Sequence, residues 1–130
     1  EGVELREAGV GLPILKLSQP EELRLRLRWA SILHGRIVPE LAITGGVHSG
    51  EDVIKCLMAG ANVAMVTSAL LQRGIPHLRT IIDEVIHWMT AHEYESVQQM
   101  IGSLSQSSSG NPSAFERANY LRVLSSYMLK

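Results

Sequence analysis

Two short apolar runs, each followed by small or hydroxyl residues, constrain the fold of this chain most strongly. The first run spans residues 41–44 and leads into two glycines at 45–46, and the second spans residues 62–66 and leads into a Thr-Ser pair at 67–68. Between them lies a stripe of helical period, formed by Val53, Ile54, Leu57, Met58 and Ala61. This order of strand, helix and strand predicts a βαβ unit with two parallel strands, and hence an α/β fold.

The ends of the two expected strands are the candidate binding site. Gly45 and Gly46 follow the first strand, where glycine permits positive φ angles and a close approach of a ligand to the backbone. Thr67 and Ser68 follow the second strand and open a short helix. Free N–H groups at helix starts favour anions, so the two ends together predict a clamp for one phosphate. The Gly-Gly pair by itself also fits a plain turn.

Capping signals predict where the helices begin and end. Ser18 to Glu21 reads as a capping box that opens a helix over about 20–34, although alternating Leu and Arg residues at 23–29 also fit a strand. Ser49 and Asp52 form a second box, and Gly60 fits a C-terminal cap. The pattern further predicts helices over 68–73, 77–91, 96–104 and 112–128, and an extended arm over 1–17.

Composition limits the classes of partner. The chain has 130 residues and a formal net charge of −1, which gives no electrostatic case for a nucleic acid or an anionic membrane. No apolar run approaches the roughly 20 residues that span a bilayer. The single cysteine, Cys56, excludes an intrachain disulfide and indicates a reducing compartment, so we expect a cytoplasmic protein. Cys56 follows a helical pattern and is expected to be a buried, inert thiol.

The titratable residues indicate no catalytic group and no metal site. The five histidines show no metal-ligand spacing, and the separation of His87 and His92 predicts different helix faces. His48 lies beside the proposed phosphate clamp; we expect an exposed loop histidine, with contact to the phosphate as the alternative. The arginines at 24, 26 and 28 are expected to form a solvated helix face, with binding of a phosphate or an acidic partner as the alternative.

Three local stretches, together with the glycine and Thr-Ser elements, indicate a family. They are Glu-Leu-Arg-Leu-Arg-Leu-Arg-Trp at 22–29, His-Glu-Tyr-Glu-Ser at 92–96 and Ala-Phe-Glu-Arg-Ala-Asn-Tyr at 114–120. With them the chain resembles the C-terminal part of dihydroorotate dehydrogenases, and looks most like the bacterial dihydroorotate dehydrogenase-like group. The resemblance implies a (β/α)8 TIM barrel with FMN at the carboxyl ends of its strands.

The resemblance also implies how the chain is divided. Residues 1–17 would form an excursion, residues 18–91 the last βα units with strands seven and eight, and residues 92–130 a helical extension. Family members are much longer, and the chain begins at Glu1 rather than Met, so we expect a piece of a larger flavin-binding barrel.

Site residues follow from the same resemblance. Gly45, Gly46, Thr67 and Ser68 would present backbone N–H groups to the FMN phosphate. Thr67 and Ser68 stand where the best-known members have Gly-Thr, so the Thr67 side chain needs room. The family's catalytic base and pyrimidine-binding residues belong to earlier strands. No catalytic residue is therefore assigned, and Cys56 does not inherit the role of the family's catalytic cysteine.

Three functions remain open from the sequence. The first is an FMN oxidoreductase that acts on a dihydropyrimidine-like ring in pyrimidine biosynthesis, as the resemblance implies. The second is a phosphate-binding barrel of another class, an isomerase or a lyase. The third is a non-catalytic half-barrel, because two core strands do not close a barrel and open strand edges favour self-association. We expect a homo-oligomer.

Overall fold

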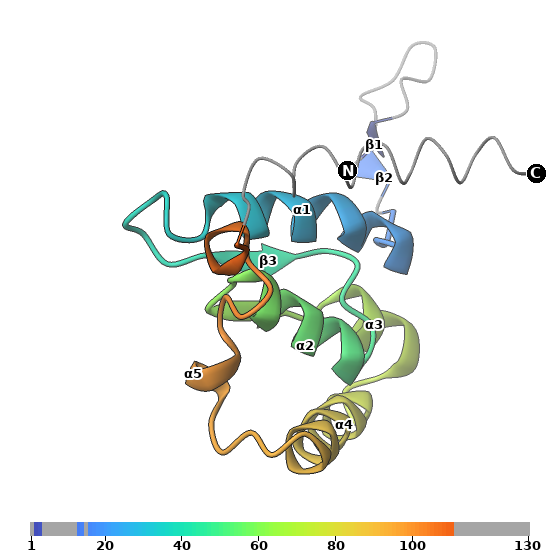
Figure 1. Cartoon of the computed structure of the whole chain (residues 1–130). Helices are drawn as coiled ribbons and strands as arrows, with labels where there is room; N and C mark the ends of the chain where they lie inside the picture. The colour runs from blue at the N-terminus through green and yellow to red at the C-terminus, as the bar shows by residue number, and fades with distance from the viewer. Residues whose placement is uncertain (1, 4–12, 15, 111–130) are drawn as a thin grey trace, which may run out of the picture.

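The computed structural model describes residues 2–3, 13–14 and 16–110, and shows helices packed on a small sheet (Figure 1). The strands are β1 (Gly2–Val3), β2 (Pro13–Ile14), β3 (Ala42–Thr44) and β4 (Val63–Met65). The helical elements are η1 (Pro20–Glu22), α1 (Leu23–Leu33), α2 (Gly50–Ala59), α3 (Ser68–Arg73), α4 (His77–Ala91), α5 (Val97–Met100) and η2 (Gln106–Ser108). The helix predicted over 112–128 lies outside the described residues, as does most of the predicted arm; within the arm, β1 pairs antiparallel with β2.

The predicted βαβ unit is confirmed. Strand β3 pairs in parallel with β4, with Ile43 opposite Ala64, and α2 connects them. The hydroxyl of Ser49 accepts the N–H of Asp52 at 3.3 Å, and the Asp52 carboxylate accepts the N–H of Ser49 at 3.1 Å. Gly60 ends α2 in the left-handed region at φ 116°, so both predicted caps of α2 are present.

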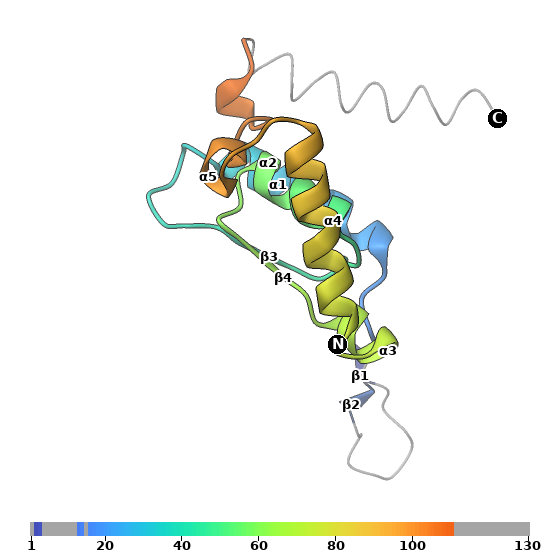
Figure 2. The ribbon, with the colours of Figure 1, turned by 90° about the horizontal axis from the view of Figure 1, so that it is seen from below.

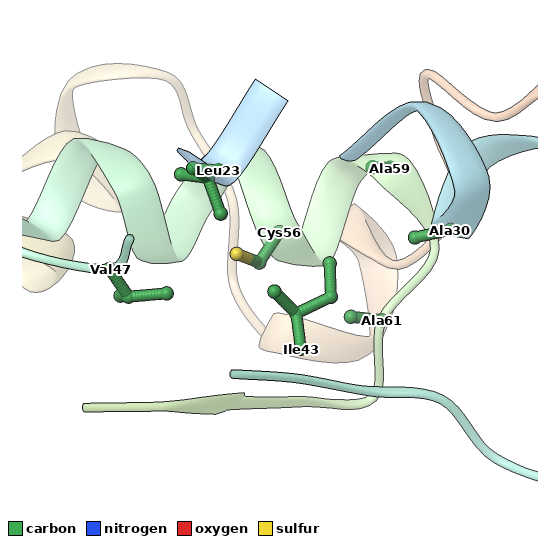
Figure 3. Packing of buried hydrophobic residues seen from close by; sticks show 7 residues of the cluster. All are labelled: Leu23, Ala30, Ile43, Val47, Cys56, Ala59 and Ala61. Atoms are coloured by element: carbon green, nitrogen blue, oxygen red, sulfur yellow. The ribbon is translucent and has the colours of Figure 1, made fainter. Parts of the chain in front are cut away.

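The core lies on one face of the β3–β4 sheet. Figure 3 shows α1 and α2 on the same side of both strands. The cluster between them consists of Leu23, Ala30, Ile43, Val47, Cys56, Ala59 and Ala61. Cys56 is fully buried, as predicted. Desolvation, with a smaller contribution from the charge of Asp52, raises the pKa of the Cys56 thiol to about 12, so the thiol is protonated at neutral pH.

The other face of the sheet is exposed. Val63 and Met65 are about half exposed, and Ala42 and Thr44 beside them are also exposed. Side chains alternate along a strand, so Ile43 points into the core while its neighbours point away. Within the described residues, helices cover one face only.

Helix α1 settles the ambiguity between helix and strand at residues 23–29. Leu23 and Leu27, four residues apart, face the core, whereas Leu25 is 64% exposed. In a strand, residues 23, 25 and 27 would all point to the same face. A helix instead places Leu25 on the opposite side from Leu23 and Leu27. The helical segment begins at Pro20, as predicted, but its cap is Gln19 and not Ser18; the Gln19 N–H donates to the Glu22 carboxylate at 2.8 Å.

The helix predicted over 96–104, after α4, is shorter in the structure than predicted. Helix α5 covers only Val97–Met100, not 96–104, and Gly102 has φ 74°. The N–H of Gly102 donates to the Leu57 carbonyl at 3.0 Å, and that of Leu104 donates to the Met58 carbonyl at 2.9 Å. These bonds satisfy the last carbonyls of α2 and compete with continuation of α5.

Helix α4 packs beside α2 (Figure 2). The contact is close at Gly50, whose N–H donates to the Glu84 carboxylate at 2.6 Å. A Cβ at Gly50 would lie 2.9 Å from the Ile81 carbonyl oxygen. Across the described part of the chain, none of the helices combines the length and apolar character needed to cross a bilayer.

Candidate phosphate-binding site

The four site residues predicted from the sequence line one cleft. It lies at the carboxyl ends of β3 and β4, and its volume is about 290 Å³. The lining residues are Lys16, Ser18, Arg26, Thr44, Gly45, Gly46, Val47, Met65, Thr67 and Ser68. Parallel strands bring their carboxyl ends to one edge of the sheet, so this convergence follows from the register of β3 with β4.

The two glycines of the cleft are needed for different reasons. Gly45 and Gly46 have φ angles of 83° and 82°, a region that other residues adopt at a cost. A Cβ at Gly46 would lie 2.6 Å from the Leu23 backbone nitrogen, so Gly46 permits the start of α1 to approach the turn. A Cβ at Gly45 would lie 2.9 Å from the guanidinium of Arg26, so Gly45 leaves room for that charge.

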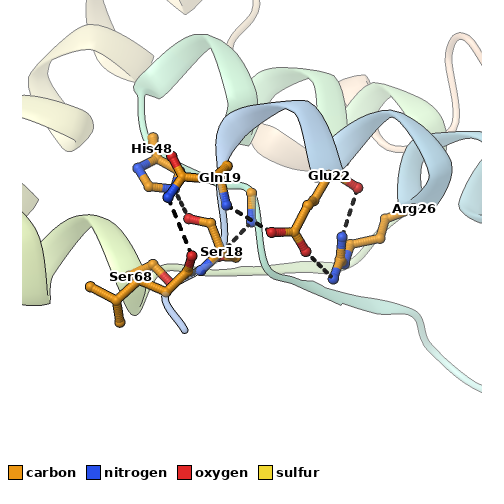
Figure 4. A network of polar contacts seen from close by, with 8 residues as sticks. Ser18, Gln19, Glu22, Arg26, His48 and Ser68 are labelled. Atoms are coloured by element: carbon orange, nitrogen blue, oxygen red, sulfur yellow. Dashed lines mark hydrogen bonds and ion pairs between the residues drawn. The ribbon is translucent and has the colours of Figure 1, made fainter. Parts of the chain in front are cut away.

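Ser18 joins the two strand ends, a role that the sequence reasoning missed. Its hydroxyl accepts the N–H of Gly46 at 3.0 Å and lies 2.8 Å from the hydroxyl of Ser68 (Figure 4). The Ser18 N–H also donates to the Ser68 hydroxyl at 3.1 Å. Sequence reasoning had assigned Ser18 as the helix cap. Gln19 and Glu22 have the same spacing as Ser18 and Glu21. This second possible capping pair could have indicated that Ser18 is available for another role.

His48 is buried, with 5% of its surface exposed, so the prediction of an exposed loop histidine is wrong. Its Nε2 lies 2.9 Å from the Ser18 carbonyl oxygen. A carbonyl oxygen only accepts, so Nε2 carries a proton and donates it in this bond. The His48 carbonyl oxygen in turn lies 3.1 Å from Nε2 of His77. His48 is not among the cleft residues, and it holds Ser18 from behind.

Two positively charged side chains line the cleft, those of Lys16 and Arg26. The Nη1 of Arg26 donates to the Glu22 carbonyl at 2.7 Å, and its Nη2 lies 3.3 Å from the Glu22 carboxylate. The hydrogen bond from the Gln19 backbone lowers the pKa of Glu22, with smaller effects of Arg26 and Lys16 in the same direction. Of the three arginines expected on a solvated face, Arg26 alone lines this cleft.

A larger cavity of about 560 Å³ lies between the start of α2 and the end of α4. Both His87 and His92 line it, which corrects the expectation that they point to different faces. His92 lies just beyond the helix, where its ring stacks on Trp88 with centroids 3.9 Å apart. Within the described ranges, no three His, Cys, Asp or Glu residues are grouped so as to hold a metal ion.

Comparisons with known proteins agree with the resemblance stated from the sequence. No protein-family model matches the chain. It is 34% identical over 73 residues to "Probable dihydroorotate dehydrogenase A (fumarate)" of Enterococcus faecalis, and 32% identical over 65 residues to "Dihydroorotate dehydrogenase B (NAD(+)), catalytic subunit" of Methanocaldococcus jannaschii. It is also 26% identical over 58 residues to "Dihydropyrimidine dehydrogenase (NADP(+)), chloroplastic" of Arabidopsis thaliana.

The extent of these matches is limited. They cover 55%, 50% and 45% of this chain, respectively, but only 24%, 21% and 14% of the three relatives. The similarity of this chain to dihydroorotate dehydrogenases is thus confirmed. The chain spans about a quarter of the length of the first two relatives.

Proposed function

We propose that this chain forms the flavin-phosphate end of an FMN-dependent, dihydroorotate dehydrogenase-like oxidoreductase with a (β/α)8 barrel. The observation that carries the proposal is the cleft at the ends of β3 and β4. All four residues that the resemblance assigned to the phosphate, Gly45, Gly46, Thr67 and Ser68, line it together. The similarity to dihydroorotate dehydrogenases favours this class over an isomerase or a lyase.

The chemistry of the cleft fits a phosphate group. Two cationic side chains, Lys16 and Arg26, reach it, and hydroxyl groups are contributed by Ser18, Thr44, Thr67 and Ser68. Among the described residues that line the cleft, none is acidic. Phosphate oxygens accept several hydrogen bonds at once, preferably from charged donors, and this set of side chains meets that requirement. Thr67 is exposed, which gives its side chain the room that the resemblance required.

Each residue has a distinct part in this proposal. Gly45 adopts a positive φ and, having no Cβ, leaves room for the Arg26 guanidinium. The Gly46 N–H donates to the Ser18 hydroxyl, which differs from the role expected for it, and Ser18 itself lines the cleft. Ser68 binds Ser18 from the second strand end and fixes the separation of the two ends. In this proposal, one anion would lie between the two strand ends.

When bound, FMN would supply hydride transfer with a carbon of a dihydropyrimidine-like substrate. The chain's own residues would orient the cofactor by its phosphate. The substrate class comes from the names of the relatives, in which dihydroorotate and dihydropyrimidine recur. The cytoplasm is the proposed compartment.

Flavin titration of the protein in its natural full length tests the proposal. We expect FMN to bind at least about tenfold more tightly than riboflavin, because riboflavin lacks the phosphate and tenfold corresponds to about 1.4 kcal/mol. Ser68→Ala should weaken FMN binding less than Gly45→Val, which obstructs the cleft. Ser49→Ala, outside the cleft, should leave FMN affinity unchanged. If the protein binds inorganic phosphate but binds neither FMN nor riboflavin, the isomerase or lyase is favoured instead.

A further inference from the structure

We propose that Arg26 forms an ion pair with the bound phosphate, and that this pair replaces the contact between Arg26 and the Glu22 carboxylate. This inference rests on the proposed function, because it concerns the same cleft. It adds a charge-sensing residue that neither the glycine turn nor the Thr-Ser pair suggested. The ligand class is a phosphate monoester, such as the terminal phosphate of FMN.

The position of Arg26 carries the argument. It lies one turn into α1 and lines the cleft. Its guanidinium is close to Gly45, since a Cβ there would lie 2.9 Å from Nη2. The guanidinium therefore stands directly over the turn expected to hold the phosphate, and the absence of a side chain at Gly45 makes this position possible.

Two bonds of different kinds hold the guanidinium. The bond from Nη1 to the Glu22 carbonyl is short, at 2.7 Å, and does not involve the carboxylate. The contact from Nη2 to the Glu22 carboxylate is longer, at 3.3 Å, and both side chains are substantially exposed. An exposed pair four residues apart on a helix contributes little to stability, whereas a bidentate bond from arginine to phosphate is much stronger. Exchange of partner is therefore favourable, while the carbonyl keeps Arg26 in place.

Arg24 provides a matched control on the same helix. It is exposed, carries the same charge and lines the cavities between α1 and α2 instead of the phosphate cleft. A long-range effect of net charge would appear equally in Arg24→Gln and Arg26→Gln. A direct role would appear only in Arg26→Gln.

The experiment is a titration of the chain with inorganic phosphate and with FMN, followed by the backbone amide NMR signals of Gly45 and Gly46. We expect Arg26→Gln to weaken phosphate binding about tenfold, since a charge-assisted bond is lost. Arg26→Lys should restore part of the affinity. Glu22→Gln, which keeps an oxygen for the Gln19 N–H, should tighten binding about twofold because the competing charge is gone. Arg24→Gln should change affinity by less than about twofold.

The outcomes separate this inference from the proposed function. If both ligands bind at the two glycines but Arg26→Gln and Arg24→Gln behave alike, the role of Arg26 is refuted and the proposed function stands. If phosphate binds with dependence on Arg26 but FMN does not, the proposed function fails and Arg26 keeps its role. If Arg26→Gln fails to fold, Glu22→Gln decides: weaker or unchanged binding overturns the exchange. Absence of any binding refutes both.

Discussion

Helices α2 and α4 have similar amphipathic sequences but very different surroundings. In α2 the apolar stripe is buried: Ile54 and Leu57 are at most 5% exposed and Cys56 is fully buried. In α4 Ile81 is the one buried residue, while Ile82 is 43% and Ile86 is 55% exposed. The helices also begin differently, because Ser49 caps α2 through its side chain whereas Pro76 gives α4 no such cap.

This contrast shows that an amphipathic stripe predicts a helix but not what covers it. Helix α2 lies between the sheet, α1 and α4, and its stripe is enclosed. Helix α4 contacts α2 closely at Gly50, beside Ile81 and Glu84. Of its other apolar residues, Leu78, Ile82 and Ile86 are exposed, as are Leu71 and Ile75 just before it.

The largest difference between the two helices should appear in a matched pair of isoleucine truncations. Ile54→Ala, at a buried site, should lower the free energy of unfolding by about 2–5 kcal/mol, because a cavity is left in the core. Ile86→Ala, at a site 55% exposed, should cost less than about 0.5 kcal/mol. Urea unfolding measures both, and equal losses would show that α4 is as enclosed as α2.

The buried thiol on α2 should make stability fall in alkaline solution. The pKa of Cys56 is raised to about 12 in the folded state, so between its ordinary pKa and 12 the unfolded chain releases a proton that the folded chain keeps. Stability then decreases as pH rises above about 9, by up to roughly 1.4 kcal/mol per pH unit. Urea unfolding at several pH values checks this against Cys56→Ala, which lacks the thiol; parallel curves for the two proteins would contradict it.

The outward face of α4 should support self-association of the chain. Ile82→Asp with Ile86→Asp should raise the dissociation constant of the oligomer about tenfold or more, because apolar area no longer leaves water on association. Sedimentation of wild type and variant at several concentrations measures the change. Asp83→Asn, on the same helix and exposed, is the control. A wild-type chain that stays monomeric at all concentrations would refute the prediction.

The smallest effect concerns the start of α2. Ser49→Ala should cost about 1 kcal/mol, because the Asp52 N–H loses its acceptor. Ser96→Ala at the start of α5 should cost almost nothing, since that side chain makes no capping bond. Thermal unfolding of both variants provides the comparison, and an equal shift in the two melting temperatures would contradict it.

Local chemistry was sufficient to predict much of this structure. The capping box of Ser49 and Asp52, the C-terminal cap at Gly60 and the parallel strands around α2 were all read from spacing and residue type. These features depend on bonds between residues close in sequence, or on the short reach of a βαβ unit. The same reasoning predicted Gly45, Gly46, Thr67 and Ser68 as one cluster, since parallel strands must end at one edge.

Tertiary structure decided what depends on distant segments. Ser18 left its expected capping role because Gly46 and Ser68, 28 and 50 residues away, compete for its hydroxyl. His48 is buried, and its Nε2 donates a hydrogen bond to the carbonyl of Ser18, 30 residues away. The helical turn of α1 places Arg26, but not Arg24, beside Gly45. A sequence pattern gives the period of a helix but not the surface against which the helix packs. Here the packing of α1 against the turn at Gly45 determines which arginine lies in the cleft.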